Sequence, residues 1–148
     1  MLYSVIPKLK GEVNGHADHI KFANPHTVFV CSAPKDSLWY DALEETTRIL
    51  SNARSITGEK YQVVRVPYPT NYRHGIDGKG YNYNCGLVVN KKMIVPVYGA
   101  PEDELALKIY RETLPGYKVV GVDFSAYLAG GINCQTIEIP PAVTKRVK

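Results

Sequence analysis

The sequence has few cysteines and no paired spacing among them. Cys31, Cys85 and Cys134 are odd in number and widely separated, and no C-x-x-C pair occurs. This pattern argues against a disulfide framework and against a cysteine-rich zinc site. We therefore expect no metal and no cofactor, and the free thiols suit a reducing cytoplasm.

Long apolar runs are also missing. Residues 1–7 form too short an apolar stretch for a signal peptide, and no later run approaches the roughly 18 apolar residues of a membrane-spanning helix. We expect a soluble, cytoplasmic protein with no membrane partner. A chain of 148 residues can bury a core without disulfides or metal, so we expect a single domain over residues 1–148.

Positive charge is not concentrated in one place. The formal net charge is +4, but the basic residues are scattered, and the densest groups are Lys91-Lys92 and Lys145-Arg146-Lys148. A surface for nucleic acid needs Arg and Lys interleaved with aromatic residues on one face. The 11 tyrosines show no such arrangement in the sequence, and we expect no nucleic-acid partner.

Hydrophobic periodicity indicates two copies of one unit, each with the order strand, strand, helix, strand. The helix entrances match, because Ser32–Asp36 resembles Gly99–Asp103. Repeated units of this size stack or close around an axis, since each cannot bury its apolar face alone. We expect strands at 20–23, 27–31, 61–66, 85–89, 93–98 and 118–122, one helix capped by Asp36 or Ser37 and reaching Ala53, one helix from Ala100 to Pro115, a long polar loop over 70–80, and the first strand of a third unit at 135–139.

Polar or reactive residues precede the first strand of each unit. His16 and Asp18 precede the first copy, Asn82 and Asn84 the second, and Cys134 the third. Where units stack or close, corresponding strand ends converge, so these residues can share one site. For the two asparagines, the alternative is that they serve only the turn that follows Gly78 and Gly80.

Cys134 is the candidate nucleophile, because the flexible residues Gly130 and Gly131 place it directly before the predicted strand at 135–139. A cysteine attacks as thiolate and needs an acid-base partner in a partly open, polar setting. His16 can be that partner, and Asp18 points to the same side in an extended segment. The alternative is that Cys134 is a small buried apolar residue and that His16 and Asp18 are surface groups.

Four segments of the chain carry a family resemblance. They are Asn14–Asp18, Leu87–Asn90 with Ile94–Pro96 downstream, Leu114–Val122 and Gly130–Cys134. In this order they resemble the agmatine deiminase and bacterial peptidylarginine deiminase family of the guanidine-modifying, or pentein, superfamily, over nearly the whole chain. The resemblance implies an α/β fold of the pentein type, a ring of five ββαβ modules, of which this chain holds two plus an extra strand.

The resemblance also implies a reaction. Cys134 attacks the central carbon of a guanidinium group, His16 protonates the leaving group and then activates water, and Asp18 holds guanidinium N–H groups. The product is a ureido compound, and agmatine, free arginine and peptidyl arginine all remain candidate substrates. The expected substrate-binding positions are Asn14, Gly15, Gly131, Asn82 and Asn84.

Two departures from the family leave alternatives open. The family's N-terminal half carries another guanidinium-binding carboxylate in an Arg-Asp-x-Gly-Pro-like segment, which this chain lacks, and Ile132-Asn133 stands where the family has a histidine before the cysteine. We expect a homodimer or a separate chain to supply the missing half. The alternative functions are a catalytically silent guanidine- or Arg-binding module or subunit, and amidino transfer to an amine.

Overall fold

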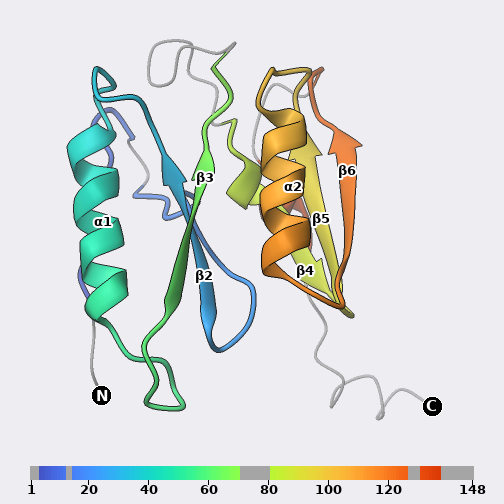
Figure 1. Cartoon of the computed structure of the whole chain (residues 1–148). Helices are drawn as coiled ribbons and strands as arrows, with labels where there is room; N and C mark the ends of the chain where they lie inside the picture. The colour runs from blue at the N-terminus through green and yellow to red at the C-terminus, as the bar shows by residue number, and fades with distance from the viewer. Residues whose placement is uncertain (1–3, 13–14, 71–80, 127–130, 138–148) are drawn as a thin grey trace.

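The computed structural model describes residues 4–12, 15–70, 81–126 and 131–137. Two units with the same order of elements lie side by side (Figure 1). This arrangement confirms the predicted pair of ββαβ units. The first unit contains β1 (Ile20–Phe22), β2 (Thr27–Ser32), α1 (Tyr40–Asn52) and β3 (Gln62–Pro67); the second contains the 3-10 turn η1 (Tyr83–Cys85), β4 (Leu87–Val89), β5 (Lys92–Val97), α2 (Asp103–Thr113) and β6 (Lys118–Asp123), and a further 3-10 turn, η2 (Asn133–Gln135), follows.

The two sheets have the same topology. β2 lies between β1 and β3, pairing antiparallel with β1 and parallel with β3, and β5 pairs in the same way with β4 and β6. Short turns join the antiparallel strands, whereas a helix joins the parallel ones, as their geometry requires. In the β4–β5 turn, Asn90 and Lys91 both have positive φ, of 48° and 56°, as a two-residue hairpin turn demands.

Each helix buries one apolar stripe. Leu43, Thr46 and Leu50 are the buried residues of α1, at spacings of three and four that place them on one face. The start of α1 differs from the prediction, because the helix begins at Tyr40 and neither Asp36 nor Ser37 caps it. Instead, Ser37 Oγ accepts a hydrogen bond from the Trp39 N–H at 3.2 Å, which fixes a turn before the helix.

Two predicted strand starts are wrong. Cys85 belongs to η1, and β4 begins only at Leu87, because Asn82 Oδ1 accepts the Cys85 N–H at 3.0 Å and closes a turn. Gln135 belongs to η2, where its N–H bonds the Ile132 carbonyl at 3.1 Å. Thr136 and Ile137, which also belong to the predicted third-unit strand, are not in a strand. Residues 138–139 of that prediction and most of the predicted polar loop, 71–80, lie outside the described residues.

One hydrophobic cluster runs through both units. Phe29 and Val66 of the first sheet share it with Met93, Val95 and Tyr110 of the second unit. The rings of Phe29 and Tyr110 lie 4.6 Å apart between centroids. In Figure 1, α2 lies between the two sheets and so covers the first sheet as well as its own. Neither unit therefore buries its apolar face alone, as the repeat predicted.

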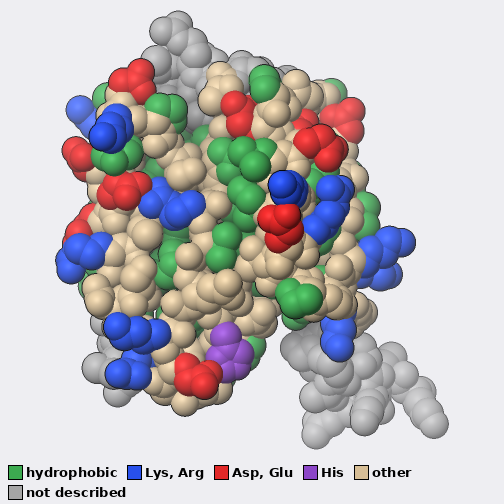
Figure 2. Space-filling view, in the orientation of Figure 1, with side chains coloured by type: hydrophobic (Ala, Val, Ile, Leu, Met, Phe, Trp, Pro, Cys, Tyr) green, Lys and Arg blue, Asp and Glu red, His purple; other side chains and the backbone are tan. Residues whose placement is uncertain are grey.

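The surface shown in Figure 2 carries acidic and basic side chains interspersed over both units. Within the described part of the chain, neither helix combines the length and the hydropathy that crossing a membrane requires.

Candidate functional site

Strand directions bring several segments to one end of the first sheet. β1 runs antiparallel to β2, so the residues before Ile20 lie beside the end of β2, where the Cys31 N–H donates to the His19 carbonyl at 2.8 Å. β3 runs parallel to β2, and Tyr68 follows it at the same end, bonded through its N–H to the Ser32 carbonyl at 3.1 Å. The carboxyl ends of parallel strands are where α/β sheets commonly place a site.

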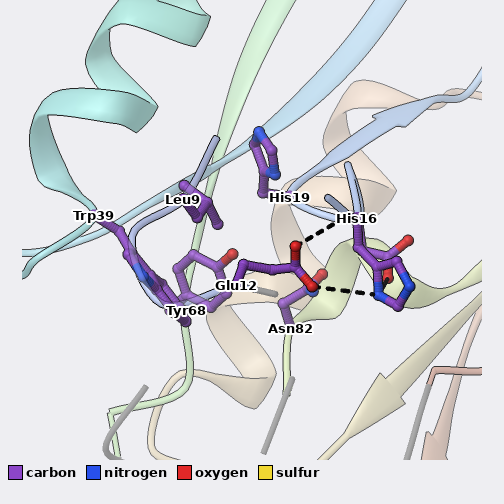
Figure 3. A pocket seen from close by; sticks show the side chains of 8 residues that line it. Leu9, Glu12, His16, His19, Trp39, Tyr68 and Asn82 are labelled. Carbon is purple, nitrogen blue, oxygen red and sulfur yellow. Dashed lines mark hydrogen bonds and ion pairs between the residues drawn. The ribbon is translucent and has the colours of Figure 1, made fainter. Parts of the chain in front are cut away.

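A cavity of about 110 Å³ lies at this end of the sheet. In Figure 3, Trp39, Tyr68 and Leu9 form one side of it, and the carboxylate of Glu12 points towards His16 on the other. The rings of Trp39 and Tyr68 are 5.2 Å apart between centroids. The described lining contains carboxylates but neither Lys nor Arg, so it suits a cation that carries an apolar stem. The lining residues are Leu9, Glu12, His16, Asp18, His19, Trp39, Tyr68 and Asn82.

Two carboxylates flank one nitrogen of His16. Its Nδ1 lies 3.7 Å from Asp18 Oδ2 and 3.9 Å from Glu12 Oε1. Glu12 also accepts the backbone N–H groups of Gly15 and His16, and Gly15 has a φ of +72°, which a residue with a side chain adopts only under strain. The His16 ring therefore lies beside two negative charges, at distances longer than a hydrogen bond.

The turn that contains Cys134 is joined to Asp18. Asn133 Nδ2 donates to Asp18 Oδ1 at 3.0 Å across 115 sequence positions. Cys134 is exposed, unlike a buried structural cysteine, and its N–H bonds the Gly131 carbonyl at 3.2 Å. Gly131 packs so closely on Cys85 that an added Cβ would lie 2.3 Å from the Cys85 Cβ. The structure thus brings His16 and Asp18 together and places the Cys134 turn against Asp18.

The other two cysteines are buried. Burial raises the pKa of the Cys31 thiol to about 12. Burial also raises the pKa of Cys85, and the negative charge of Asp18 raises it further. Both thiols are therefore protonated and unreactive at neutral pH, in contrast to the exposed Cys134.

The two asparagines of the second unit have different surroundings. Asn82 lines the cavity, and its Nδ2 lies 3.0 Å from the Cys85 sulfur. Asn84 is fully buried and is not among the lining residues. It donates to the His19 carbonyl at 3.0 Å and accepts the Tyr110 hydroxyl at 2.6 Å. Asn14, a further predicted site position, lies outside the described residues.

Sequence reasoning missed the apolar side of the cavity. Neither Leu9 nor Trp39 is among the predicted site residues. Tyr68 carried a usable signal, because it directly follows a strand that pairs in parallel, and such strand ends converge. His19 is 2% exposed, and burial lowers its pKa; Figure 3 shows its ring turned away from Glu12 and His16.

The described residues contain no group of three or more His, Cys, Asp and Glu side chains that could hold a metal ion.

The ββαβ units and the polar segments at their converging ends define an α/β fold of the pentein type. The chain belongs to the Porphyromonas-type peptidyl-arginine deiminase family, whose model matches residues 7–140.

Relatives in several bacteria support this assignment. The chain is 30% identical, over 87% of its length, to a Listeria monocytogenes protein provisionally named agmatine deiminase 1, and 33% identical, over 85% of its length, to a provisionally named agmatine deiminase of Streptomyces coelicolor. It covers 42% and 39% of these two proteins. The solved structure of the agmatine deiminase of C. jejuni superposes with a TM-score of 0.68 at 26% identity, over 85% of this chain and 38% of the other. The chain thus spans about two fifths of the length of the proteins it matches.

Proposed function

We propose that this chain supplies the nucleophile, the acid-base group and one guanidinium-binding carboxylate of a deiminase site. The reaction is the hydrolysis of a guanidine group to a ureido product and ammonia. The observation that carries the proposal is the hydrogen bond between Asn133 and Asp18, which unites the cysteine turn with the histidine segment. In this view residues 1–148 form one domain, equivalent to the C-terminal part of a full-length deiminase.

The proposed reaction proceeds in two stages. The Cys134 thiolate attacks the central carbon, and the C–N bond breaks as His16 gives a proton to departing ammonia, which leaves a thiouronium adduct. Water then attacks the same carbon while His16 takes its proton, and the C–S bond breaks to release the ureido product and the thiol. Asp18 accepts guanidinium N–H bonds throughout. The position of His16 supports this role, because its ring lies 3.7 Å from the Asp18 carboxylate that holds the guanidinium in this proposal.

The cavity supports a cationic substrate. Glu12 and Asp18 contribute carboxylates to the described lining, while Trp39 and Tyr68 offer an aromatic wall for an alkyl stem. Agmatine, free arginine and peptidyl arginine all present such a group, and the test below separates them.

A partner completes the site in this proposal. These 148 residues lack the Arg-Asp-x-Gly-Pro-like segment, and in this proposal a second carboxylate comes from outside them. We propose a second copy of the chain as that source, with a separate chain as the alternative. Apolar side chains on outer strands support association, since Phe22 of β1 is 52% exposed and Val122 of β6 is 38% exposed. Light scattering at micromolar concentration tests it, because a strictly monomeric particle that still deiminates would contradict the need for a partner.

Product analysis tests the chemistry. The purified chain is incubated with agmatine, free arginine or an arginine peptide, and ammonia and the ureido product are quantified. We expect turnover of one substrate, loss of turnover in Cys134→Ala, and a strong decrease in His16→Asn. His26→Asn is the matched control, because His26 is also exposed but lies in the β1–β2 turn, paired with Glu59 at 2.8 Å.

A catalytically silent guanidine-binding module is the second candidate. The observation in its favour is that these 148 residues contain no Arg-Asp-x-Gly-Pro-like segment, which carries a further guanidinium-binding carboxylate in the family. Such a module binds the substrates in calorimetry but yields neither ammonia nor a ureido product, even when folding is intact.

A further inference from the structure

Asn133 is the residue through which the two parts of the site touch. Its Nδ2 donates to Asp18 Oδ1 at 3.0 Å, and it directly precedes Cys134. The backbone bonds of this turn are local, from the Cys134 N–H to Gly131 and from the Gln135 N–H to Ile132. We propose, on the basis of the proposed function, that Asn133 is a positioning residue that orients Asp18 and seats the Cys134 turn against the His16 segment.

The two oxygens of Asp18 are divided between partners. Oδ1 accepts the Asn133 amide, while Oδ2 lies 3.7 Å from His16 Nδ1. A hydrogen bond to a carboxylate is stronger than a neutral one and restricts rotation of the group. Asn133 therefore fixes the rotation of the Asp18 carboxylate relative to His16. That rotation sets the direction in which the negative charge faces an incoming cation.

The orientation of the Asn133 amide supports this role. Its Oδ1 is buried and has no hydrogen-bond partner in the described structure, and an ideal Cβ on Gly131 would lie only 2.6 Å from it. A buried acceptor without a donor costs free energy. Turning the amide over would place Oδ1 against the carboxylate of Asp18 and lose the bond. The hydrogen bond to Asp18 thus orients the Asn133 amide, although its oxygen is left without a donor. An unsatisfied buried group of this kind is expected where a residue has a functional role.

Alkylation of Cys134 by two probes tests the proposal without any turnover. Both 2-chloroacetamidine, which is cationic, and iodoacetamide, which is neutral, form an S–C bond to Cys134 and release a halide ion. The ratio of their rate constants reports how well Asp18 directs a cation to the thiol. We expect Asp18→Asn and Asn133→Ala each to lower this ratio about tenfold, the scale of one lost charge-assisted hydrogen bond.

A double-mutant cycle separates positioning from packing. Once Asp18 is an amide, Asn133 has no charge to orient, so Asn133→Ala in the Asp18→Asn background should lower the ratio no further. Asn133→His keeps an N–H donor and should retain most of the native ratio. Asn52→Ala is the matched control, because Asn52 is an exposed asparagine of α1 that donates to the Arg48 carbonyl at 2.9 Å.

Two results would overturn the role of Asn133 alone. One is an unchanged ratio in Asn133→Ala while Asp18→Asn lowers it, which would leave the proposed deiminase site intact. The other is a full additive loss in the double variant, which would assign the effect to packing. An unchanged ratio in Asp18→Asn would instead contradict the proposed site itself and the role of Asn133 with it.

Discussion

The side-chain amide of Asn84 donates to the backbone carbonyl of His19 at 3.0 Å, although the two residues are 65 positions apart. The Tyr110 hydroxyl in turn donates to Asn84 Oδ1 at 2.6 Å, and all three residues are buried. The second unit thereby holds the segment of the first unit that carries Asp18. Asn84 stands one residue before Cys85, as Asn133 stands one before Cys134, and both asparagines bond to the segment before β1.

Replacing Asn84 should destabilise the fold. Asn84→Ala leaves the buried Tyr110 hydroxyl without its acceptor and removes one of the two donors to the His19 carbonyl. We expect the free energy of unfolding to fall by about 2–4 kcal/mol. Urea denaturation measures this change, with Asn52→Ala as the exposed control expected to cost less than about 1 kcal/mol. Equal losses in the two variants would show that the buried network contributes little.

Cys134 should be the first thiol to react in the folded protein. It is exposed, whereas burial holds the pKa of Cys31 at about 12 and also raises that of Cys85. Brief treatment with iodoacetamide near pH 7, followed by peptide mass spectrometry, should label Cys134 at least tenfold faster than either buried thiol. Denaturant should equalise the three rates. Equal labelling without denaturant would remove the physical basis for assigning Cys134 as the nucleophile.

His19 should make the protein sensitive to mild acid. Burial lowers the pKa of His19 from its usual 6.5 in the folded state. Above pH 6.5 both states hold a neutral imidazole and no stability is lost. As the pH falls below 6.5 the unfolded chain binds the proton first, so stability falls, by at most about 1.4 kcal/mol per pH unit, until the folded pKa is reached.

A neutral substitution isolates this contribution. The difference in unfolding free energy between the native protein and His19→Gln should be constant above pH 7 and should change in favour of the variant between pH 6.5 and 5. The exposed His26→Gln serves as the control. A difference that does not depend on pH would mean that His19 titrates equally in the folded and unfolded states.

The repeat made the fold predictable from the sequence. Short apolar runs bounded by turn residues, amphipathic helices and the matched helix entrances at Ser32 and Gly99 are local signals, and each was present twice. Predicted boundaries were wrong where a side chain accepts a backbone N–H that a strand would otherwise use. An example is Asn82, which accepts the Cys85 N–H and closes the turn that contains Cys85. Such competition depends on side-chain geometry that hydrophobic periodicity does not encode.

The candidate site was predictable only in part. His16, Asp18 and Cys134 stood out because reactive residues recur before matched strands, independently of the core. Trp39 and Tyr68 did not, because an aromatic residue looks the same in sequence whether it fills a core or faces a cavity. Their position depends on tertiary packing, here the close approach of the two rings beside Leu9.

Gly131 should tolerate no side chain. An added Cβ would lie 2.3 Å from the Cys85 Cβ and 2.6 Å from Asn133 Oδ1, distances that real Cβ atoms essentially never show. Gly131→Ala therefore has to move the turn that carries Cys134. We expect a loss of about 1–3 kcal/mol in unfolding free energy, the usual cost of overpacking, together with slower reaction of Cys134 with chloroacetamidine.

The cause of this loss can be separated from a general glycine effect. In Gly58→Ala the added Cβ has no atom within 4 Å, and the only cost is the strain of a side chain at a φ of +84°. This variant should therefore lower stability without changing the reactivity of Cys134. Cys85→Gly removes the Cβ that lies 2.3 Å from the one added at residue 131. Combining it with Gly131→Ala should recover part of the Cys134 reactivity. Native reactivity in Gly131→Ala alone would show that the close approach to Cys85 does not determine where the cysteine turn lies.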